Sequence, residues 1–144
     1  MASFAIKNDG SSVTILGKTY AKGDYVPIPY IKNDLNVGRE KLWGNDTGRV
    51  QSGDYKGTLI GIFPKITVNV SGTKLTYKDV EAICQLCEQA TASCKYYNAK
   101  TSSVKTKVFY FDSVSITHKR IDEKNPKKNK YDTISIVAVA TSKE

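Results

Sequence analysis

Three cysteines and a single histidine are the residues of this 144-residue chain best suited to catalysis or metal binding. Cys84-Gln85-Leu86-Cys87 has the CxxC spacing of zinc-binding and redox-active sites. A structural zinc site needs four ligands, and only Cys94 and the distant His118 remain to complete one. A redox pair belongs at a helix N-terminus, where the dipole lowers the thiol pKa, but this pair falls mid-helix. The pattern therefore favours small cysteines packed in a core over a metal or redox site.

The single histidine, His118, is the residue on which any Ser-His-Asp or Cys-His nucleophile would depend. Lys119 and Arg120 follow it, and no GxSxG elbow or similar context surrounds it. Acidic residues are scattered, and their spacing nominates no pair for general acid–base hydrolysis. We therefore predict a non-enzymatic protein with no catalytic residue, no metal and no cofactor. An enzyme or metalloprotein built on His118 and the three cysteines stays open as a third hypothesis.

A glycine-punctuated stretch, residues 42–57, holds the only tryptophan of the chain. Its glycine spacing matches neither GxxxxGK[ST] nor GxGxxG, so the glycines predict turns rather than a phosphate loop. Tryptophan and arginine are enriched among binding hot spots. The alternative is a loop folded back on its own domain, with Trp43 as its anchor. The residues that we expect at a subunit interface are Arg39, Trp43, Asp46, Arg49 and Tyr55.

Positive charge is concentrated near the C-terminus. The chain has a net charge of +8, and residues 118–130 carry six basic side chains against Asp122 and Glu123, a net of +4. No aromatic side chain lies within residues 119–130 to stack on a base, which weakens a single-stranded nucleic-acid interpretation. Solvated charge, contact with an acidic neighbour and nucleic-acid binding all stay open. The residues that would contact an acidic partner or nucleic acid are Lys119, Arg120, Lys124, Lys127, Lys128 and Lys130.

Most of the elements that position these residues are predicted as short strands. Residues 58–70 alternate apolar and polar side chains, as a half-buried strand does, with Pro64 indicating a bulge or an edge. Residues 25–31 should be extended at a sheet edge, because Pro27 and Pro29 cannot donate ladder hydrogen bonds. Residues 32–57 are predicted to form a long loop. Two strands at 114–119 and 131–141 flank the basic segment, which makes residues 119–130 the loop of a basic hairpin.

One helix is predicted at about 76–91. Thr76 can cap its N-terminus, with Asp79 in the capping-box position, and apolar residues follow at helical spacing. Several strands, this helix and further strands predict a mainly β (α+β) fold, an antiparallel β-sandwich or barrel rather than a parallel βαβ fold. The length predicts a single domain over residues 1–144. No apolar run reaches the roughly 20 residues that span a bilayer, so no membrane partner is expected.

The layout resembles that of small tail and baseplate proteins from long-tailed phages of Gram-positive bacteria. An N-terminal strand pair and the extended segment 25–31 come first, followed by Gly48-Arg49 and Gly57. An Ile-Phe-Pro-Lys-Ile strand at 62–66 and a short helix that begins at Leu75-Thr76 come next. The strand Cys94-Lys95-Tyr96-Tyr97, a Val-Phe-Tyr-Phe strand at 108–111 and a closing strand pair complete the layout.

This resemblance implies a tail-tube-like fold and a non-enzymatic virion component that is made in the host cytoplasm. It further implies a homo-oligomeric ring around the tail axis, with loops that dock on neighbouring subunits and on other tail proteins. Exposed strand edges and tyrosine-rich strands are compatible with a subunit that its neighbours complete. From the net charge, the alternative function is a small basic nucleic-acid-binding β-domain, whose binding would fall steeply with salt.

Overall fold

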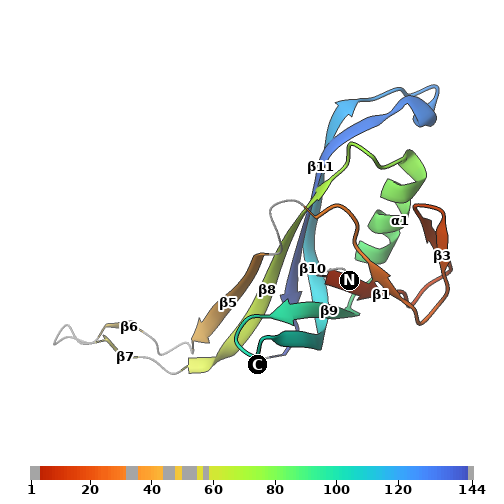
Figure 1. Ribbon diagram of the computed structural model, residues 1–144. Coiled ribbons are helices and arrows are strands. Elements are labelled where there is room, and N and C mark those ends of the chain that lie inside the picture. The colour runs from red at the N-terminus through yellow and green to blue at the C-terminus, as the bar shows by residue number, and fades with distance from the viewer. Residues whose placement is uncertain (1–3, 32–35, 44–47, 50–54, 57–58, 143–144) are drawn as a thin grey trace.

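The computed structural model describes residues 4–31, 36–43, 48–49, 55–56 and 59–142, and of these it describes the backbone alone at 42–43, 48–49, 55–56 and 59–60 (Figure 1). Strands dominate this part of the chain, with one α-helix and one short 3-10 helix. The elements in chain order are β1 (Phe4–Lys7), β2 (Val13–Ile15), β3 (Lys18–Tyr20), β4 (Tyr25–Pro27), β5 (Asn36–Trp43), β6 (Gly48–Arg49), β7 (Tyr55–Lys56), β8 (Leu59–Ser71), α1 (Tyr77–Cys87), β9 (Ala92–Asn98), β10 (Ser103–Arg120), η1 (Pro126–Lys128) and β11 (Lys130–Ala140).

Seven of these strands form one antiparallel sheet in the order β4-β1-β9-β10-β11-β8-β5, while β2–β3 and β6–β7 form separate hairpins. The predicted mainly β, antiparallel fold with one helix is therefore confirmed. The sheet is open, however, and the predicted barrel is wrong. Its edge strands β4 and β5 each pair with a single neighbour. β4 has three residues and ends in Pro27, so it offers few N–H donors for closure. α1 and the β2–β3 hairpin form the layer that covers one face (Figure 1).

Strand β5 lies inside the stretch for which the sequence predicts a long loop. It pairs antiparallel with β8, from Asn36 opposite Thr67 to Trp43 opposite Leu59. The sequence gives no strand signal here, because Gly38 and the charged residues after it have a low intrinsic preference for strands. The backbone pairing with β8 stabilises it instead. The structure therefore replaces residues 36–43 of the expected loop with an edge strand.

Pro64 marks a change of partners along β8. From Lys65 to Ser71, β8 pairs with β11, whereas its described residues before Lys65 pair with β5 alone. The ladder with β11 thus begins at Lys65, one residue after Pro64, which has no N–H to donate. The predicted bulge does not occur there, since the register shift opposite β5 lies between Leu42 and Trp43. One side of β8 does become a sheet edge at Pro64.

Helix α1 begins with the predicted capping box. The Asp79 N–H donates to Thr76 Oγ1 at 3.4 Å, and the Thr76 N–H donates to Asp79 Oδ2 at 3.1 Å. The helix ends at Cys87 rather than near residue 91. The Gln89 side chain lies at this end, where its amide donates to the Leu86 carbonyl at 2.8 Å and to the Lys7 carbonyl at 3.1 Å. This capping satisfies a helix carbonyl and fixes the helix end against β1.

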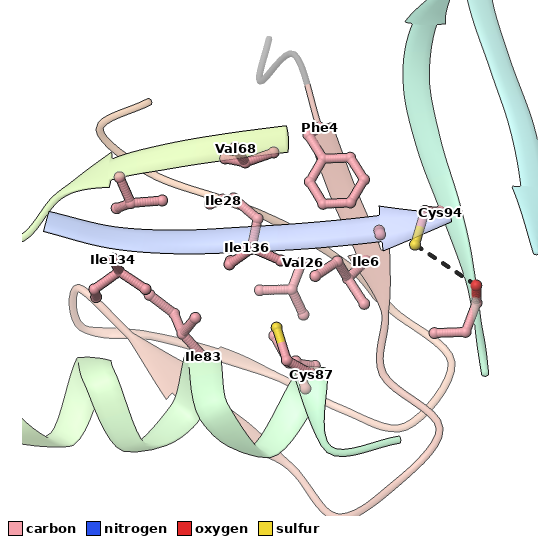
Figure 2. Packing of buried hydrophobic residues seen from close by; sticks show 14 of the residues in the cluster. Phe4, Ile6, Val26, Ile28, Val68, Ile83, Cys87, Cys94, Ile134 and Ile136 are labelled. Atoms are coloured by element: carbon pink, nitrogen blue, oxygen red, sulfur yellow. Dashed lines mark hydrogen bonds between the residues drawn. The ribbon is translucent and has the colours of Figure 1, made fainter. Parts of the chain in front are cut away.

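The core lies between the central strands of the sheet and α1. Strand alternation sends every second side chain of β8, β9 and β11 inward, where it is buried. Tyr96 of β9 and Phe109 of β10 meet edge to face there, with ring centroids 5.4 Å apart. Figure 2 shows the packed side chains of the core, among them Phe4, Ile6, Val26, Val68, Ile83, Cys87, Ile134 and Ile136.

Strands β10 and β11 form a long hairpin that continues beyond the core. β10 pairs with β9 over Ser103 to Phe109, and with β11 from Phe109 to Arg120. Register shifts between Phe111 and Ser113 and around His118 are irregularities of the kind that bend and twist a strand pair. In Figure 1 the far end of this hairpin extends past α1 at the top of the view and turns toward the helix side.

Candidate functional site

Two of the three thiols are packed inside the fold, and the described residues do not gather them into a reactive site. Cys87 and Cys94 are buried, and Cys84 is half-buried. Burial, with smaller contributions from Cys84 and Glu88, raises the pKa of Cys87 to about 12. Burial also raises the pKa of Cys94, whose Sγ donates to the Ala92 carbonyl at 3.6 Å (Figure 2). Thiols that ionise so poorly are weak nucleophiles, so the geometry supports the core interpretation of the CxxC pair.

His118 lies exposed on β10, with its ring centroid 5.5 Å from that of Tyr131. Among the described residues, its imidazole forms no hydrogen bond with a thiol, a hydroxyl or a carboxylate. The same residues contain no group of three or more His, Cys, Asp or Glu side chains that could hold a metal ion. The nucleophile or metal site considered for His118 and the cysteines is not assembled in this part of the chain.

Four of the five residues predicted at a subunit interface lie on edge strand β5 or on the β6–β7 hairpin. Arg39 is exposed on edge strand β5, opposite Pro64. Trp43 ends β5, and Arg49 of β6 pairs with Tyr55 of β7, although only the backbone is described at these three positions. Asp46 lies outside the described residues. Figure 1 shows β6 and β7 beyond the ends of β5 and β8, on the opposite side of the molecule from the β10–β11 loop.

The basic segment 119–130 forms the end of the β10–β11 hairpin, and we call it the basic tip. All six of its predicted contact residues are exposed. Its loop is held by internal hydrogen bonds: Asn129 Oδ1 accepts from the Asp122 N–H at 2.6 Å, and Asp122 Oδ1 accepts from the Lys124 N–H at 3.1 Å. Ile121 is 64% exposed, more than any other large hydrophobic side chain described. The basic tip is therefore an ordered loop that presents positive charge around one apolar side chain.

A groove of about 590 Å³, which we call the helix groove, lies between α1 and the loop end of this hairpin. Glu81 and Glu88 line the helix side of the groove and make it electronegative. Burial raises the pKa of Cys84 in the groove wall, and the charges of Glu88 and Glu81 raise it further. Sequence reasoning missed this groove, although the spacing 77, 81, 84 and 88 places those residues on one helix face. Its lining consists of Tyr77, Val80, Glu81, Cys84, Gln85 and Glu88 from the helix and His118, Pro126, Asn129 and Tyr131 from the hairpin.

The sheet face turned away from the core carries large apolar side chains. Val108 and Tyr110 of β10 flank the buried Phe109 and are 42% and 41% exposed, so they point to the opposite face. A second groove, of about 400 Å³, includes Tyr110 with Phe63 and Val139. An ion pair at 3.3 Å between Lys65 Nζ and Glu40 Oε1 lies on the neighbouring strands β8 and β5. This face thus combines apolar and charged side chains, and none of the described helices covers it (Figure 1).

No protein-family model matches the sequence, and no curated protein matches it either. Among solved structures, a chain from the tail of an empty gene transfer agent (GTA) particle, determined by helical refinement with C6 symmetry, is similar. The fold resembles that of the GTA tail chain. The TM-score is 0.51 at 10% sequence identity, and the match covers 91% of this chain and 89% of the other.

The likeness to the GTA tail chain therefore concerns the fold over nearly the whole length of both chains. At 10% identity it carries no individual side chain from one protein to the other. The basic tip, the helix groove and the β5 edge are consequently described from this chain alone. Within the described residues, no helix has the length and apolar character needed to cross a membrane.

Proposed function

We propose that this chain is a non-enzymatic structural subunit of a phage-like tail. The observation that carries the proposal is the shared fold, over 91% of this chain, with a chain from a C6-symmetric GTA tail. The sequence layout supports the same role, because it resembles tail and baseplate proteins of long-tailed phages that infect Gram-positive bacteria. The buried thiols and the isolated His118 support a non-enzymatic role, since the described residues assemble no nucleophile from them.

In this proposal the single domain assembles with copies of itself through its sheet edges. β4 and β5 each have one neighbour among the described strands, and such edges can accept a strand from another subunit. Head-to-tail contacts form a closed ring when repeating the rotation from one subunit to the next leads back to the first subunit. Around the tail axis such a ring would contact other virion tail proteins. The residues that we assign to the contact at the β5 side are Arg39, Trp43, Asp46, Arg49 and Tyr55.

Two measurements test this function. Purified protein is examined by analytical ultracentrifugation and electron microscopy for rings or tubes, and particles from the source are analysed by mass spectrometry for this chain. We expect oligomers, and we expect the chain in tails. Trp43→Ala and Arg49→Ala should weaken assembly, whereas Thr14→Ala on the β2–β3 hairpin serves as a control. A protein that stays monomeric and is absent from purified tails would refute the proposal.

A second candidate function, nucleic-acid binding, is favoured by one observation, the six exposed basic side chains of the basic tip. If all six contacted phosphates, affinity would fall about 10³-fold between roughly 50 and 200 mM salt, because counterions are released on binding. An electrophoretic mobility-shift assay at these two salt concentrations tests the idea. The absence of a shift at the lower concentration would remove this candidate.

A further inference from the structure

We propose that the basic tip of one copy of this chain docks into the helix groove of the next copy. The inference rests on the proposed function, because it requires that copies of the chain assemble. It goes further by naming the partner of the basic tip, for which the sequence leaves solvent, an acidic neighbour and nucleic acid open. Of these three alternatives, the inference selects the acidic neighbour and identifies it as a second copy of this chain.

Charge complementarity is the first argument. The basic tip carries six basic side chains, and the helix groove carries Glu81 and Glu88 on α1, both exposed. In the described part of the chain, no ion pair joins either glutamate to a basic side chain of the same copy. Two carboxylates beside a half-buried thiol therefore lack counter-charges that a second copy can supply. Opposite potentials on two surfaces favour encounter and fix their register.

Apolar complementarity is the second argument. Ile121 stands at the basic tip with 64% of its surface exposed, among charged neighbours. In the helix groove the half-buried Tyr77 offers apolar surface, and the buried Val80 and Tyr131, both 5% exposed, lie beneath it. An apolar side chain that enters such a groove, with charged groups around the rim, has the arrangement of an interface hot spot.

The geometry of the hairpin is the third argument. Neither Ile121 nor any of the six basic residues lines the helix groove of its own copy, where the loop contributes Pro126 and Asn129 instead. The hydrogen bonds that the Asn129 and Asp122 side chains accept hold the loop in shape before docking, which lowers the entropic cost of binding. The basic tip and the helix groove share Pro126 and Asn129, but the docking residues, Ile121 and the six basic side chains, lie outside the groove lining. The two docking surfaces therefore differ, so the contact is head-to-tail and can join many copies.

Charge reversal tests the electrostatic part. Replacing Lys124, Lys127 and Lys128 together with glutamate should raise the concentration needed for half-assembly about tenfold, since each exposed pair adds a small factor. Replacing Glu81 and Glu88 with lysine should weaken assembly in the same direction. A one-to-one mixture of these two variants should assemble again, because each basic-tip site then meets a groove of opposite charge. The control variant reverses Lys22, Lys100 and Lys105, which are exposed residues outside the basic tip, and should assemble like the wild type.

Disulfide trapping tests the position of the contact. Cys84 lies in the helix groove wall, so an Ile121→Cys substitution should form intermolecular disulfides with it under oxidised glutathione. Because each copy carries both thiols, a head-to-tail contact gives a ladder of covalent oligomers on a non-reducing gel. Ile121→Cys combined with Cys84→Ser should abolish the ladder, and Thr14→Cys should not produce one.

The outcomes separate this inference from the proposed function. Suppose that the wild type assembles, that the basic-tip reversal variant needs the same concentration for half-assembly as the Lys22, Lys100 and Lys105 control, and that no Cys84-dependent ladder forms. The docking inference is then wrong, and the tail function stands. If the wild type neither self-associates nor occurs in tails, both fail. A ladder that ends at dimers would show a reciprocal contact, and would likewise overturn the head-to-tail arrangement.

Discussion

Replacing Asp79 with alanine removes the carboxylate that joins α1 to the β2–β3 hairpin. Asp79 Oδ2 accepts hydrogen bonds from the Thr76 N–H and the Thr76 hydroxyl, both at 3.1 Å. Asp79 Oδ1 accepts from the Leu16 N–H at 3.0 Å, across 63 positions of sequence. Asp79 is only 6% exposed, so these bonds are largely shielded from water. The substitution should therefore destabilise both the helix start and the docked hairpin.

The magnitude follows from these three hydrogen bonds. A bond to a charged group contributes about 1.5–3 kcal/mol. Leu16 and Thr76 are exposed, so water can replace part of what is lost, and we expect a loss of about 2–4 kcal/mol in unfolding free energy. With about 3 °C per kcal/mol for a domain of this size, Tm should fall by about 6–12 °C.

Urea unfolding followed by circular dichroism provides the assay. Asp79→Asn keeps one acceptor oxygen, so it should fall between the wild type and Asp79→Ala. Thr76→Ala removes the cap hydroxyl and leaves the Leu16 bond intact, and should cost about 1 kcal/mol. If Asp79→Ala cost no more than Thr76→Ala, the tie to Leu16 would contribute nothing, and the reasoning would be refuted.

Three further predictions concern packing and thiol chemistry. Gly72→Ala should cost about 1–3 kcal/mol, because its Cβ would lie 2.7 Å from Tyr131 Cβ; Gly10→Ala, whose Cβ would lie 3.8 Å from Asn8 Oδ1, is the matched control in the same unfolding assay. Phe109→Ala should cost about 3–5 kcal/mol, whereas Tyr110→Ala on the opposite face should cost less than about 1 kcal/mol; equal losses would contradict the assigned faces. Glu88→Gln should lower the pKa of Cys84 and speed its alkylation at pH 8 more than Glu81→Gln does, because Glu88 contributes more to raising that pKa. Mass spectrometry after timed iodoacetamide treatment measures the alkylation rates. Unchanged rates would contradict the electronegative groove.

The parts of the fold that sequence reasoning predicted are those with local signals. The capping box needs only Thr76 and Asp79, three positions apart, and the structure forms it as expected. The extended segment near Pro27 is likewise an edge strand, because proline restricts the ladder wherever it stands. In each case, the information lies in a few neighbouring residues and does not depend on distant partners.

The parts that could not be predicted depend on partners far away in the sequence. β5 is a strand because β8 pairs with it, and Gly38 with its charged neighbours gives no strand signal alone. An open sheet and a barrel also share the same strand pattern, so periodicity cannot choose between them. That choice depends on the edges, where β4 and β5 lie at opposite ends of the strand order.

The helix groove shows the same limit at the level of function. In the sequence, the positive charge of residues 119–130 and the glutamates of α1 are far apart and have no visible relation. In the structure, bends in β10–β11 bring the hairpin beside the helix, so that acidic and basic surfaces occur together on each copy. A chain with both surfaces, unpaired within the described residues of one copy, can satisfy them by repetition. Repetition of one contact is also what a tail requires, so the docking inference and the proposed function are physically consistent while remaining separately testable.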